Sequence, residues 1–194
     1  KIHPDAVTVF IGPCMAKKKE AREPDIADAV DYVLTFQEVK EIFEAAEIRP
    51  EELTEEASEH SSRAGRIYAR TGGVSEAVAK TVEQLKPGRE ILVCAKQADG
   101  VKNCKELIER IKNGEVGNAN FFEGMACPGG CVGGPKAIID KEAGREQVNA
   151  YGDSASYKTP LENPYVMELL ARLNFGSVEE FLEKSDILTR DFSS

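Results

Sequence analysis

A loop that combines two cysteines with four glycines places the strongest constraint on this chain. Residues 127–135 read CPGGCVGGP, with Cys127 and Cys131 on either side of the first two glycines. Residues 121–126 before the loop are apolar apart from Glu123, which predicts a buried strand that ends at the loop. Because glycines leave backbone N–H groups bare, the loop can bring two thiolates and several N–H donors to one point.

This combination of groups suits an iron–sulfur cluster. Thiolates bind the iron, and N–H groups bond the cluster's sulfurs and offset its negative charge. The alternative is a glycine-rich turn in which the two cysteines are incidental. The composition of the loop leaves both interpretations open.

Length and charge narrow the classes of function. The 194 residues, 41% of them hydrophobic, predict a globular chain with a sizeable core, built as one domain or two small lobes. The net charge of -9 argues against nucleic-acid and anionic-membrane partners, which favour a basic face. No apolar run is long enough to span a bilayer and no secretory signal stands at the start, so we expect no membrane segment. Five cysteines, an odd number, favour metal-binding thiols in a reducing compartment, so we expect a cytoplasmic protein.

Alternating strand and helix patterns predict an α/β fold. The expected strands cover residues 7–11, 32–34, 90–95 and 120–123. The expected helices between them cover 36–46, capped by Thr35, then 74–85 and 100–113. This alternation predicts a mostly parallel four-stranded sheet with crossover helices.

The pattern changes after Pro135. Residues 136–157 are polar, and we expect a short helix near 137–141 and a mobile connection after it. Amphipathic patterns predict packing helices at 161–173 and 178–184. We therefore expect residues 1–135 to form an α/β lobe that carries the cysteines. Residues 136–194 would supply the connection and the C-terminal helices of the same domain.

A third cysteine follows the first expected strand. Cys14 comes after Gly12 and Pro13, at the strand end where open α/β sheets place their ligands. Lys17 is a candidate cation that turns back toward whatever Cys14 binds, because an ammonium group lowers a thiol's pKa and stabilises bound charge. The alternative is that the lysines of 17–19 form a solvated patch.

Three other features have simpler interpretations. Cys94 and Cys104 fall within apolar patterns, and we expect both to be core residues. Gly72 and Gly73 precede a helix, where they could hold an anion or allow close packing, and we expect close packing.

Residues 12–20 (GPCMAKKKE) and 123–134 (EGMACPGGCVGG) resemble the second and third signature motifs of the catalytic domain of [FeFe]-hydrogenases. The resemblance covers most of residues 7–175, and the chain is also similar to hydrogenase-like proteins that assist cytosolic iron–sulfur assembly. Smaller matches occur in the family's order at 31–35, 71–74, 76–77 and 162–164.

The resemblance implies a specific cofactor and reaction. The family's H-cluster is a [4Fe–4S] cluster joined through one cysteine to a two-iron unit that carries CO, cyanide and a dithiolate. Cys14 and Cys127 match ligands of the [4Fe–4S] cluster, and Cys131 matches the bridging cysteine. The implied reaction is the reversible reduction of protons to hydrogen, with electrons from ferredoxin-like clusters or domains.

The same resemblance assigns the residues around the cofactor. Lys17 matches a lysine that hydrogen-bonds a cyanide ligand, and Glu20 matches a carboxylate beside the centre. Met125 matches a methionine packed by the two-iron unit. Gly12 and Pro13, with the glycines of the third motif, would shape the pocket wall.

Two departures from the family pattern affect the expected activity. The first motif carries the fourth cluster ligand and a proton-relaying cysteine, and it would lie upstream of Lys1, where the chain looks cut. We therefore expect this chain alone to be inactive and to need the upstream remainder of its domain. Gly12 stands where catalytic members usually have methionine, as in sensory or divergent members.

Two alternative functions remain. One is a structural zinc site formed by Cys14, Cys127 and Cys131 with His3 or His60. The other is a non-catalytic redox or hydrogen sensor, or an iron–sulfur cluster carrier, of the same family.

Overall fold

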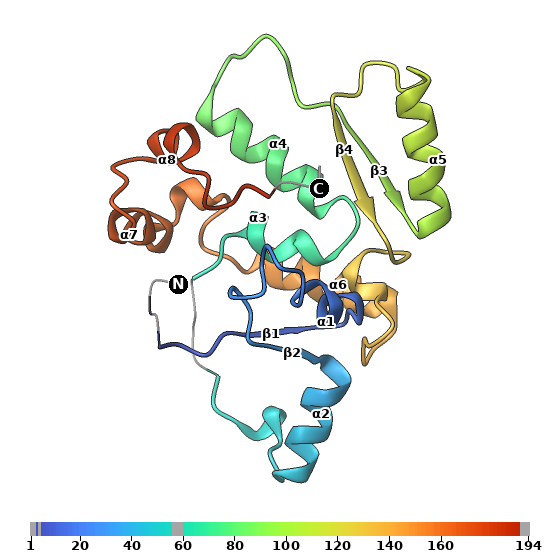
Figure 1. Ribbon diagram of the computed structural model, residues 1–194, viewed down its shortest axis with the longest axis vertical. Coiled ribbons are helices and arrows are strands. Elements are labelled where there is room, and N and C mark those ends of the chain that lie inside the picture. Colours follow the sequence, from blue (N-terminus) through green and yellow to red (C-terminus); the bar gives the residue numbers. More distant parts are fainter. Residues whose placement is uncertain (1–2, 4, 56–59, 191–194) are drawn as a thin grey trace.

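Two short parallel β-sheets with helices around them form the framework of the molecule (Figure 1). The computed structural model describes residues 3, 5–55 and 60–190. Within these residues no helix is both long enough and apolar enough to cross a membrane.

The first sheet pairs β1 (Val9–Gly12) with β2 (Tyr32–Thr35), and α1 (Ala16–Glu20) lies between them in the chain. Helix α2 (Phe36–Ala45) begins directly after β2, and a short 3-10 turn, η1 (Pro50–Glu52), follows it. The Thr35 hydroxyl accepts from the Glu38 N–H, and the Glu38 carboxylate accepts from the Thr35 N–H at 2.7 Å. Hydrogen bonds from Lys18 and from Thr35 hold the pKa of Glu38 at about 2. The N-cap predicted at Thr35 is therefore confirmed.

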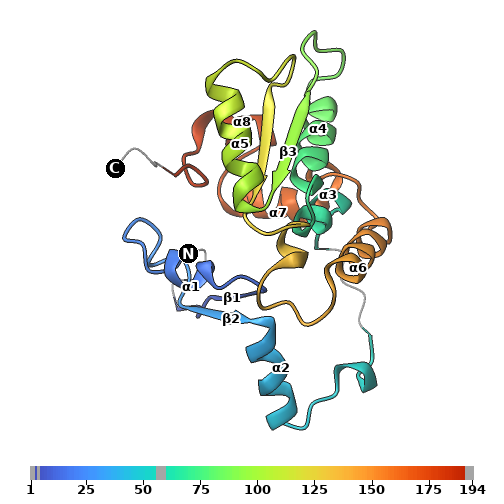
Figure 2. The same ribbon diagram turned by 90° about the vertical axis from the view of Figure 1, so that its right-hand side faces the viewer.

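The second sheet pairs β3 (Ala95–Asp99) with β4 (Phe121–Met125). Helices α4 (Gly73–Leu85) and α5 (Val101–Lys112) lie on either side of this sheet (Figures 1 and 2). The register sets Asp99 opposite Met125, at the edge where both strands end.

A group of helices packs together next to α4 (Figure 1): α3 (Arg63–Arg66), the 3-10 turn η2 (Ile67–Ala69) and α6 (Lys141–Asp153). Ile67 is fully buried at its centre. A Cβ on Gly73 would lie 1.8 Å from the Ile67 carbonyl oxygen, and one on Gly152 would lie 2.6 Å from Ile67 Cγ2. The close packing expected at Gly73 is confirmed, because only glycine fits there.

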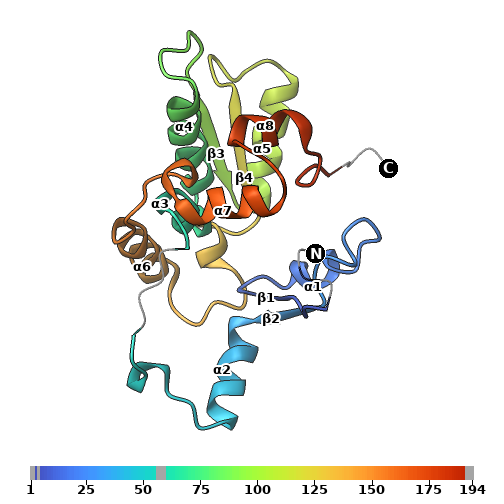
Figure 3. The ribbon, with the colours of Figure 1, turned by 90° about the vertical axis from the view of Figure 1, so that its left-hand side faces the viewer.

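The C-terminal part contains η4 (Pro160–Glu162), α7 (Pro164–Arg172) and α8 (Val178–Lys184), seen most clearly in Figure 3. Buried Asn163 caps α7 by accepting from the Tyr165 N–H at 3.0 Å. Arg190 reaches back to α1, where its Nη1 lies 3.3 Å from Glu20 Oε1. Arg190 therefore lies beside the segment that follows β1.

The predicted α/β class with parallel strands is confirmed, but the single four-stranded sheet is wrong. In the part of the chain that the structure describes, the strands pair as two separate two-stranded sheets. The physical reason is that the edge partners of a strand are decided by contacts between distant segments, which no local pattern in the sequence contains.

The third strand was predicted too early in the chain. The expected strand covered residues 90–95, whereas β3 begins at Ala95 and ends at Asp99. Ile91 and Leu92 are 65% and 67% exposed, so this apolar run does not form a core strand. Pairing with residues 121–125 of β4 fixed the register, which a single strand's pattern does not contain.

The short helix expected near 137–141 and the mobile connection expected after it are also wrong, because the helix in this segment is α6, which begins at Lys141 and occupies most of the expected connection. Asp140 caps this helix by accepting from the Glu142 N–H at 2.9 Å. The helix packs through glycines and not through large apolar side chains: a Cβ on Gly144 would lie 3.3 Å from Val132 Cβ. A helix with such a contact face has no apolar stripe for a sequence pattern to detect.

The molecule exposes far more surface than a compact chain of its size. Its accessible area is 13,591 Å², whereas the scaling for folded monomers gives about 9,100 Å² at 21.2 kDa. The first strand, expected to be buried, exposes Val9, Phe10 and Ile11. Among the described residues the buried apolar core consists of Ala64, Ile67, Ala77, Ala98 and Leu170.

Candidate functional site

The first part of the site is the segment that follows β1. Gly12 is buried, and a Cβ there would lie 2.9 Å from Cε1 of the Phe10 ring. The Pro13 carbonyl oxygen accepts a hydrogen bond from the Lys136 N–H at 3.1 Å. Cys14 follows as a half-buried free cysteine, just before α1.

The second part is the loop between β4 and α6, which contains the 3-10 turn η3 (Cys131–Gly133). The Gly130 N–H donates to the Cys127 carbonyl at 3.0 Å, and the Gly134 N–H donates to the Cys131 carbonyl at 2.9 Å. Gly129 and Gly130 have φ values of 87° and 92°, a region that side chains rarely adopt. The backbone therefore makes tight turns at the two cysteines.

The two parts contact each other through Gly134. A Cβ on this glycine would lie 2.8 Å from the Pro13 carbonyl oxygen and 2.9 Å from the Cys131 carbonyl oxygen. Together with the bond from Lys136 to Pro13, this contact brings Cys14 toward the cysteine loop.

The electrostatics of the thiols reflect this proximity. Cys131 is exposed as a residue, but the protein around its sulfur shields it from water and raises its pKa. Repulsion by Cys14 and by Cys127 raises the pKa of Cys131 further, while Lys17 lowers it. Burial and then repulsion by Cys14 also raise the pKa of Cys127. Cys131 thus lies within electrostatic reach of Cys14, Cys127 and Lys17, the other three groups predicted from the sequence.

Lys17 and Glu20 interact with each other across one turn of α1. The Lys17 ammonium forms an ion pair with the Glu20 carboxylate, and Glu20 also contacts Arg190. Both side chains are partly exposed. The structure therefore brings two predicted site residues together and adds a cation, Arg190, from the C-terminal tail.

Sequence reasoning missed an acidic residue that holds the loop. Asp99 Oδ2 accepts from Thr71 Oγ1 and from the Gly129 N–H, both at 2.9 Å. The sequence feature that could have indicated Asp99 was a carboxylate directly before a glycine at the end of a strand. It was overlooked because the third strand was predicted to end at residue 95, four residues before Asp99.

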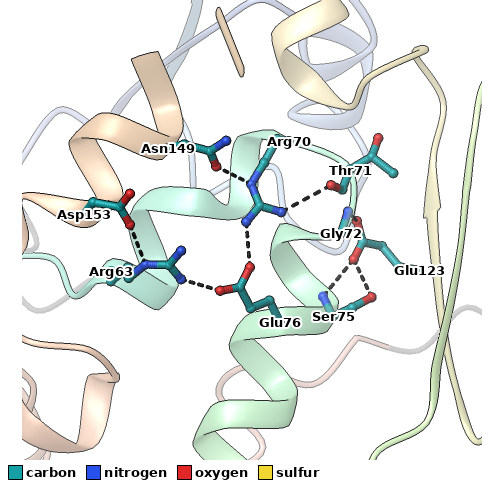
Figure 4. Close-up of polar contacts among 9 residues, drawn as sticks. All are labelled: Arg63, Arg70, Thr71, Gly72, Ser75, Glu76, Glu123, Asn149 and Asp153. Atoms are coloured by element: carbon teal, nitrogen blue, oxygen red, sulfur yellow. Dashed lines mark hydrogen bonds and ion pairs between the residues drawn. The ribbon is translucent and has the colours of Figure 1, made fainter. Parts of the chain in front are cut away.

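A second buried carboxylate, also missed, anchors α4 to the sheet (Figure 4). Glu123, in the middle of β4, is 5% exposed. Its oxygens accept from the N–H groups of Gly72 and Ser75 at 2.7 Å and from Ser75 Oγ at 2.6 Å. The helix N-terminus does therefore bind an anion, but the anion is the protein's own side chain.

An ion network beside it joins α3, α4 and α6 (Figure 4). Arg70 Nη2 donates to Glu76 at 2.6 Å, Arg70 Nε donates to Asn149 at 2.6 Å, and Arg63 Nε donates to Asp153 at 2.9 Å. Arg63 also pairs with Glu76. Burial alone would raise the pKa of Glu76, but the hydrogen bonds and charges of the two arginines outweigh it, so the pKa lies below its ordinary value.

The remaining cysteines lie at the second sheet. Cys104 is half-buried, with its Sγ 3.3 Å from the carbonyl oxygen of Met125 and 3.5 Å from that of Ala98. Cys94, also half-buried, precedes β3, and its N–H donates to Asn120 at 2.8 Å. Both therefore have packing contacts in this sheet, although neither is fully buried. The backbone of Met125 is fixed by the Gly100 N–H at 2.9 Å.

The two histidines contact α7. The His60 ring packs edge-on against Tyr165 with centroids 4.3 Å apart, and His3 Nε2 lies 3.0 Å from Arg172 Nη2. As the side chains stand, no three His, Cys, Asp or Glu residues in the described ranges could hold a single metal ion. The four-ligand zinc site considered from the sequence is therefore not assembled.

Comparisons with known proteins give a consistent assignment. A family model described as the iron only hydrogenase large subunit, C-terminal domain, matches residues 1–135. The NADP-reducing hydrogenase subunit HndD of Solidesulfovibrio fructosivorans is 30% identical over 200 residues, which cover 84% of this chain and 34% of that protein. Iron hydrogenase 1 of Clostridium pasteurianum is 28% identical over 158 residues, which cover 66% of this chain and 28% of that protein.

A solved structure gives the same fold. The [FeFe]-hydrogenase HydA(deltaEFG) aligns with 92% of this chain and 61% of its own chain, with a TM-score of 0.65 and 24% identity. The chain therefore spans about a third of the two curated relatives and about three fifths of this structural neighbour. The chain belongs to the family of the C-terminal domain of the iron-only hydrogenase large subunit.

Proposed function

We propose that this chain is part of a hydrogenase-like protein that binds an H-cluster type centre and reversibly reduces protons to hydrogen. The observation that carries the proposal is the backbone contact of Gly134 with Pro13, which brings Cys14 toward the loop of Cys127 and Cys131. Lys17 lies close enough to that loop to lower the pKa of Cys131. Cys14 follows β1, and the other two cysteines lie in the loop after β4. Family membership supports the same centre.

The donor set fits a cluster better than a single ion. In a [4Fe–4S] cluster each thiolate binds a different iron, so the ligand sulfurs stand farther apart than ligands that share one metal. Cys14 and Cys127 raise the pKa of Cys131, yet within the described residues these thiols form no single-ion site, which is compatible with ligands that bind different irons of one cluster. Gly133 and Gly134 carry no side chains, so this part of the loop presents backbone atoms.

When bound, the H-cluster supplies the electron transfer and the proton reduction. The chain's residues would bind and orient it. The thiolates of Cys14 and Cys127 would bind the [4Fe–4S] part, and that of Cys131 would bridge to the two-iron unit. Lys17 would offset negative charge, Glu20 would orient Lys17 through their ion pair, and Met125 would pack beside the centre.

We propose that the fourth thiolate comes from the upstream remainder of the same domain. A [4Fe–4S] cluster takes four ligands, and Cys94 and Cys104 contact the second sheet instead. An upstream part would also cover exposed surface: the total accessible area is about 4,500 Å² larger than the scaling for compact monomers gives. The exposed side chains of β1, Val9, Phe10 and Ile11, are part of that surface. On this proposal the chain alone does not turn over, and ferredoxin-like clusters or domains supply electrons to the assembled protein.

Iron and sulfide analysis tests the cluster assignment. The chain would be reconstituted anaerobically with iron and sulfide, with excess 2-mercaptoethanol as a source of the fourth thiolate. We expect about four irons and four sulfides per chain, with broad visible absorption. Cys14→Ala, Cys127→Ala and Cys131→Ala should each lower the iron content.

Cys94→Ala and Cys104→Ala are the matched controls and should retain the iron of the unmodified chain. Equal iron content in all five variants would overturn the assignment. Uptake of zinc without iron would leave only the fold in common with hydrogenases.

A second candidate is a non-catalytic sensor or cluster carrier, and the surroundings of Gly12 favour it. The Phe10 ring lies over Gly12, so the methionine usual in catalytic members would need that ring to move. Hydrogen evolution from reduced methyl viologen distinguishes the two once the chain is assembled with an upstream part. A bound cluster without hydrogen evolution would favour sensing or cluster transfer.

A further inference from the structure

We infer that Asp99 is a positioning residue for the cysteine loop, fixing Gly129 so that Cys127 and Cys131 are held at a set separation. The consequence for metal binding rests on the function proposed above. The positioning itself is a property of the metal-free chain, so the two can be tested separately.

The argument begins with a closed ring of hydrogen bonds. Asp99 Oδ2 accepts from Thr71 Oγ1 and from the Gly129 N–H at 2.9 Å each. The Thr71 N–H in turn donates to the Gly129 carbonyl at 3.0 Å. These three hydrogen bonds form a closed ring of Asp99, Thr71 and Gly129. Both the N–H and the carbonyl group of Gly129 take part in it.

Gly129 stands two residues from each cysteine, so its position determines how the loop carries both thiols. The adjacent Gly130 leaves no space for adjustment: a Cβ there would lie 2.6 Å from the Thr71 nitrogen and 2.9 Å from the Arg70 carbonyl carbon. The loop is therefore pressed against the segment before α4 as well as bonded to it.

Both anchors of the ring are rigid. Asp99 is the last residue of β3, paired in register with Met125, and the next residue, Gly100, donates its N–H to the Met125 carbonyl at 2.9 Å. On the other side, Arg70 is bound by Glu76 and Asn149 (Figure 4). Asp99 therefore transmits the position of the sheet to the loop.

The chemistry of the ring predicts which substitutions preserve it. An asparagine oxygen can accept the same two hydrogen bonds without the charge, whereas leucine fills similar space and accepts none. Asp99→Asn should therefore keep the loop in place, and Asp99→Leu should release it and leave the Gly129 N–H without its acceptor.

The experiment compares these two variants by two measurements. Amide hydrogen exchange over residues 127–134 of the metal-free chain should become about tenfold faster in Asp99→Leu and stay near the original rate in Asp99→Asn. Iron affinity after reconstitution should fall about 10- to 100-fold in Asp99→Leu, because groups that hold metal ligands in place have effects of this size. Asp99→Asn should retain most of the iron affinity of the unmodified chain. Glu106→Leu, an exposed acid on α5, controls for loss of charge in this region.

Unchanged exchange and unchanged iron affinity in Asp99→Leu would overturn the inference. If the unmodified chain binds no iron, the proposed function fails, and the exchange rates alone decide the role of Asp99. If Asp99→Leu does not fold, Thr71→Val and its conservative counterpart Thr71→Ser decide instead. Faster amide exchange in Thr71→Val but not in Thr71→Ser supports the ring of hydrogen bonds, and equal exchange rates in the two variants overturn it.

Discussion

The Pro13 carbonyl oxygen accepts a hydrogen bond from the Lys136 N–H at 3.1 Å. This bond joins the segment that follows β1 to the segment that follows the cysteine loop. Gly134 sits against the same carbonyl, so the contact between the two cysteine-bearing parts consists mainly of backbone atoms. The position of Cys14 relative to Cys131 therefore depends on how closely two stretches of main chain approach.

Gly134→Ala should separate the two parts. The new methyl group would lie 2.8 Å from the Pro13 oxygen and 2.9 Å from the Cys131 oxygen, and backbone atoms on both sides would have to move. We expect a loss of stability of about 1–3 kcal/mol in urea unfolding, together with lower iron content after reconstitution.

Gly65→Ala is the matched control for this substitution. Gly65 is exposed in α3, and the nearest atom to an added Cβ is Ser62 Oγ at 3.9 Å. This variant should be as stable as the original or slightly more stable, because alanine favours helix. Equal effects of the two substitutions would contradict the steric argument.

Glu123→Gln should weaken the attachment of α4 to β4. Both oxygens of Glu123 accept hydrogen bonds, from Gly72 and from Ser75, and an amide would set an NH₂ group against N–H donors. We expect a loss of about 1–3 kcal/mol in the free energy of unfolding, measured with urea. Glu109→Gln, on the exposed side of α5, should change it by less than about 0.5 kcal/mol.

The ion network around Glu76 should make the free energy of unfolding depend on pH. Its folded pKa lies below the ordinary value of 4.5, because Arg70 and Arg63 outweigh the effect of burial. The unfolded chain therefore takes up the proton first as pH falls, and the stabilisation, complete above about pH 4.5, is lost as pH falls through the folded pKa.

Glu76→Gln should have a lower urea midpoint than the original chain at pH 7, and the gap should narrow below pH 4.5. Glu83→Gln, an exposed position on the same helix, is the control and should follow the original chain throughout. A gap that stays constant with pH would contradict the assignment of the ion network.

Lys17→Met should make Cys131 less reactive. Burial and the neighbouring cysteines raise the pKa of Cys131, and Lys17 is the group that lowers it. Removing the ammonium should reduce the thiolate fraction and slow alkylation of Cys131 by iodoacetamide at neutral pH by roughly two- to fivefold. Mass spectrometry of the labelled peptide measures the rate.

Lys19→Met, which removes an exposed lysine of the same helix, should leave that rate unchanged. Equal slowing in both variants would show that net charge, and not the position of Lys17, controls the thiol.

The errors in predicting the fold from sequence share one cause, which is that packing partners are not encoded locally. Residues 91–93 have the composition of a core strand, yet β3 lies farther along the chain because its register with β4 decides its place. Helix α6 was missed because its contact face includes Gly144 and Gly152, which pack closely without an apolar stripe. The same displacement of β3 hid Asp99 as a residue at the strand end.

The sequence alone was enough to predict the α/β class, three of the four strands and the Thr35 cap, because each depends on a short pattern. It also singled out Cys14, Cys127 and Cys131 as candidate ligands. Only the tertiary structure decided that the strands divide into two sheets and that Gly134 meets Pro13. It alone identified Asp99 and Glu123 as the carboxylates that hold the loop and the helix. Those features depend on which distant backbone groups meet, and hydrogen bonds and close contacts between distant segments leave no periodic trace in a sequence.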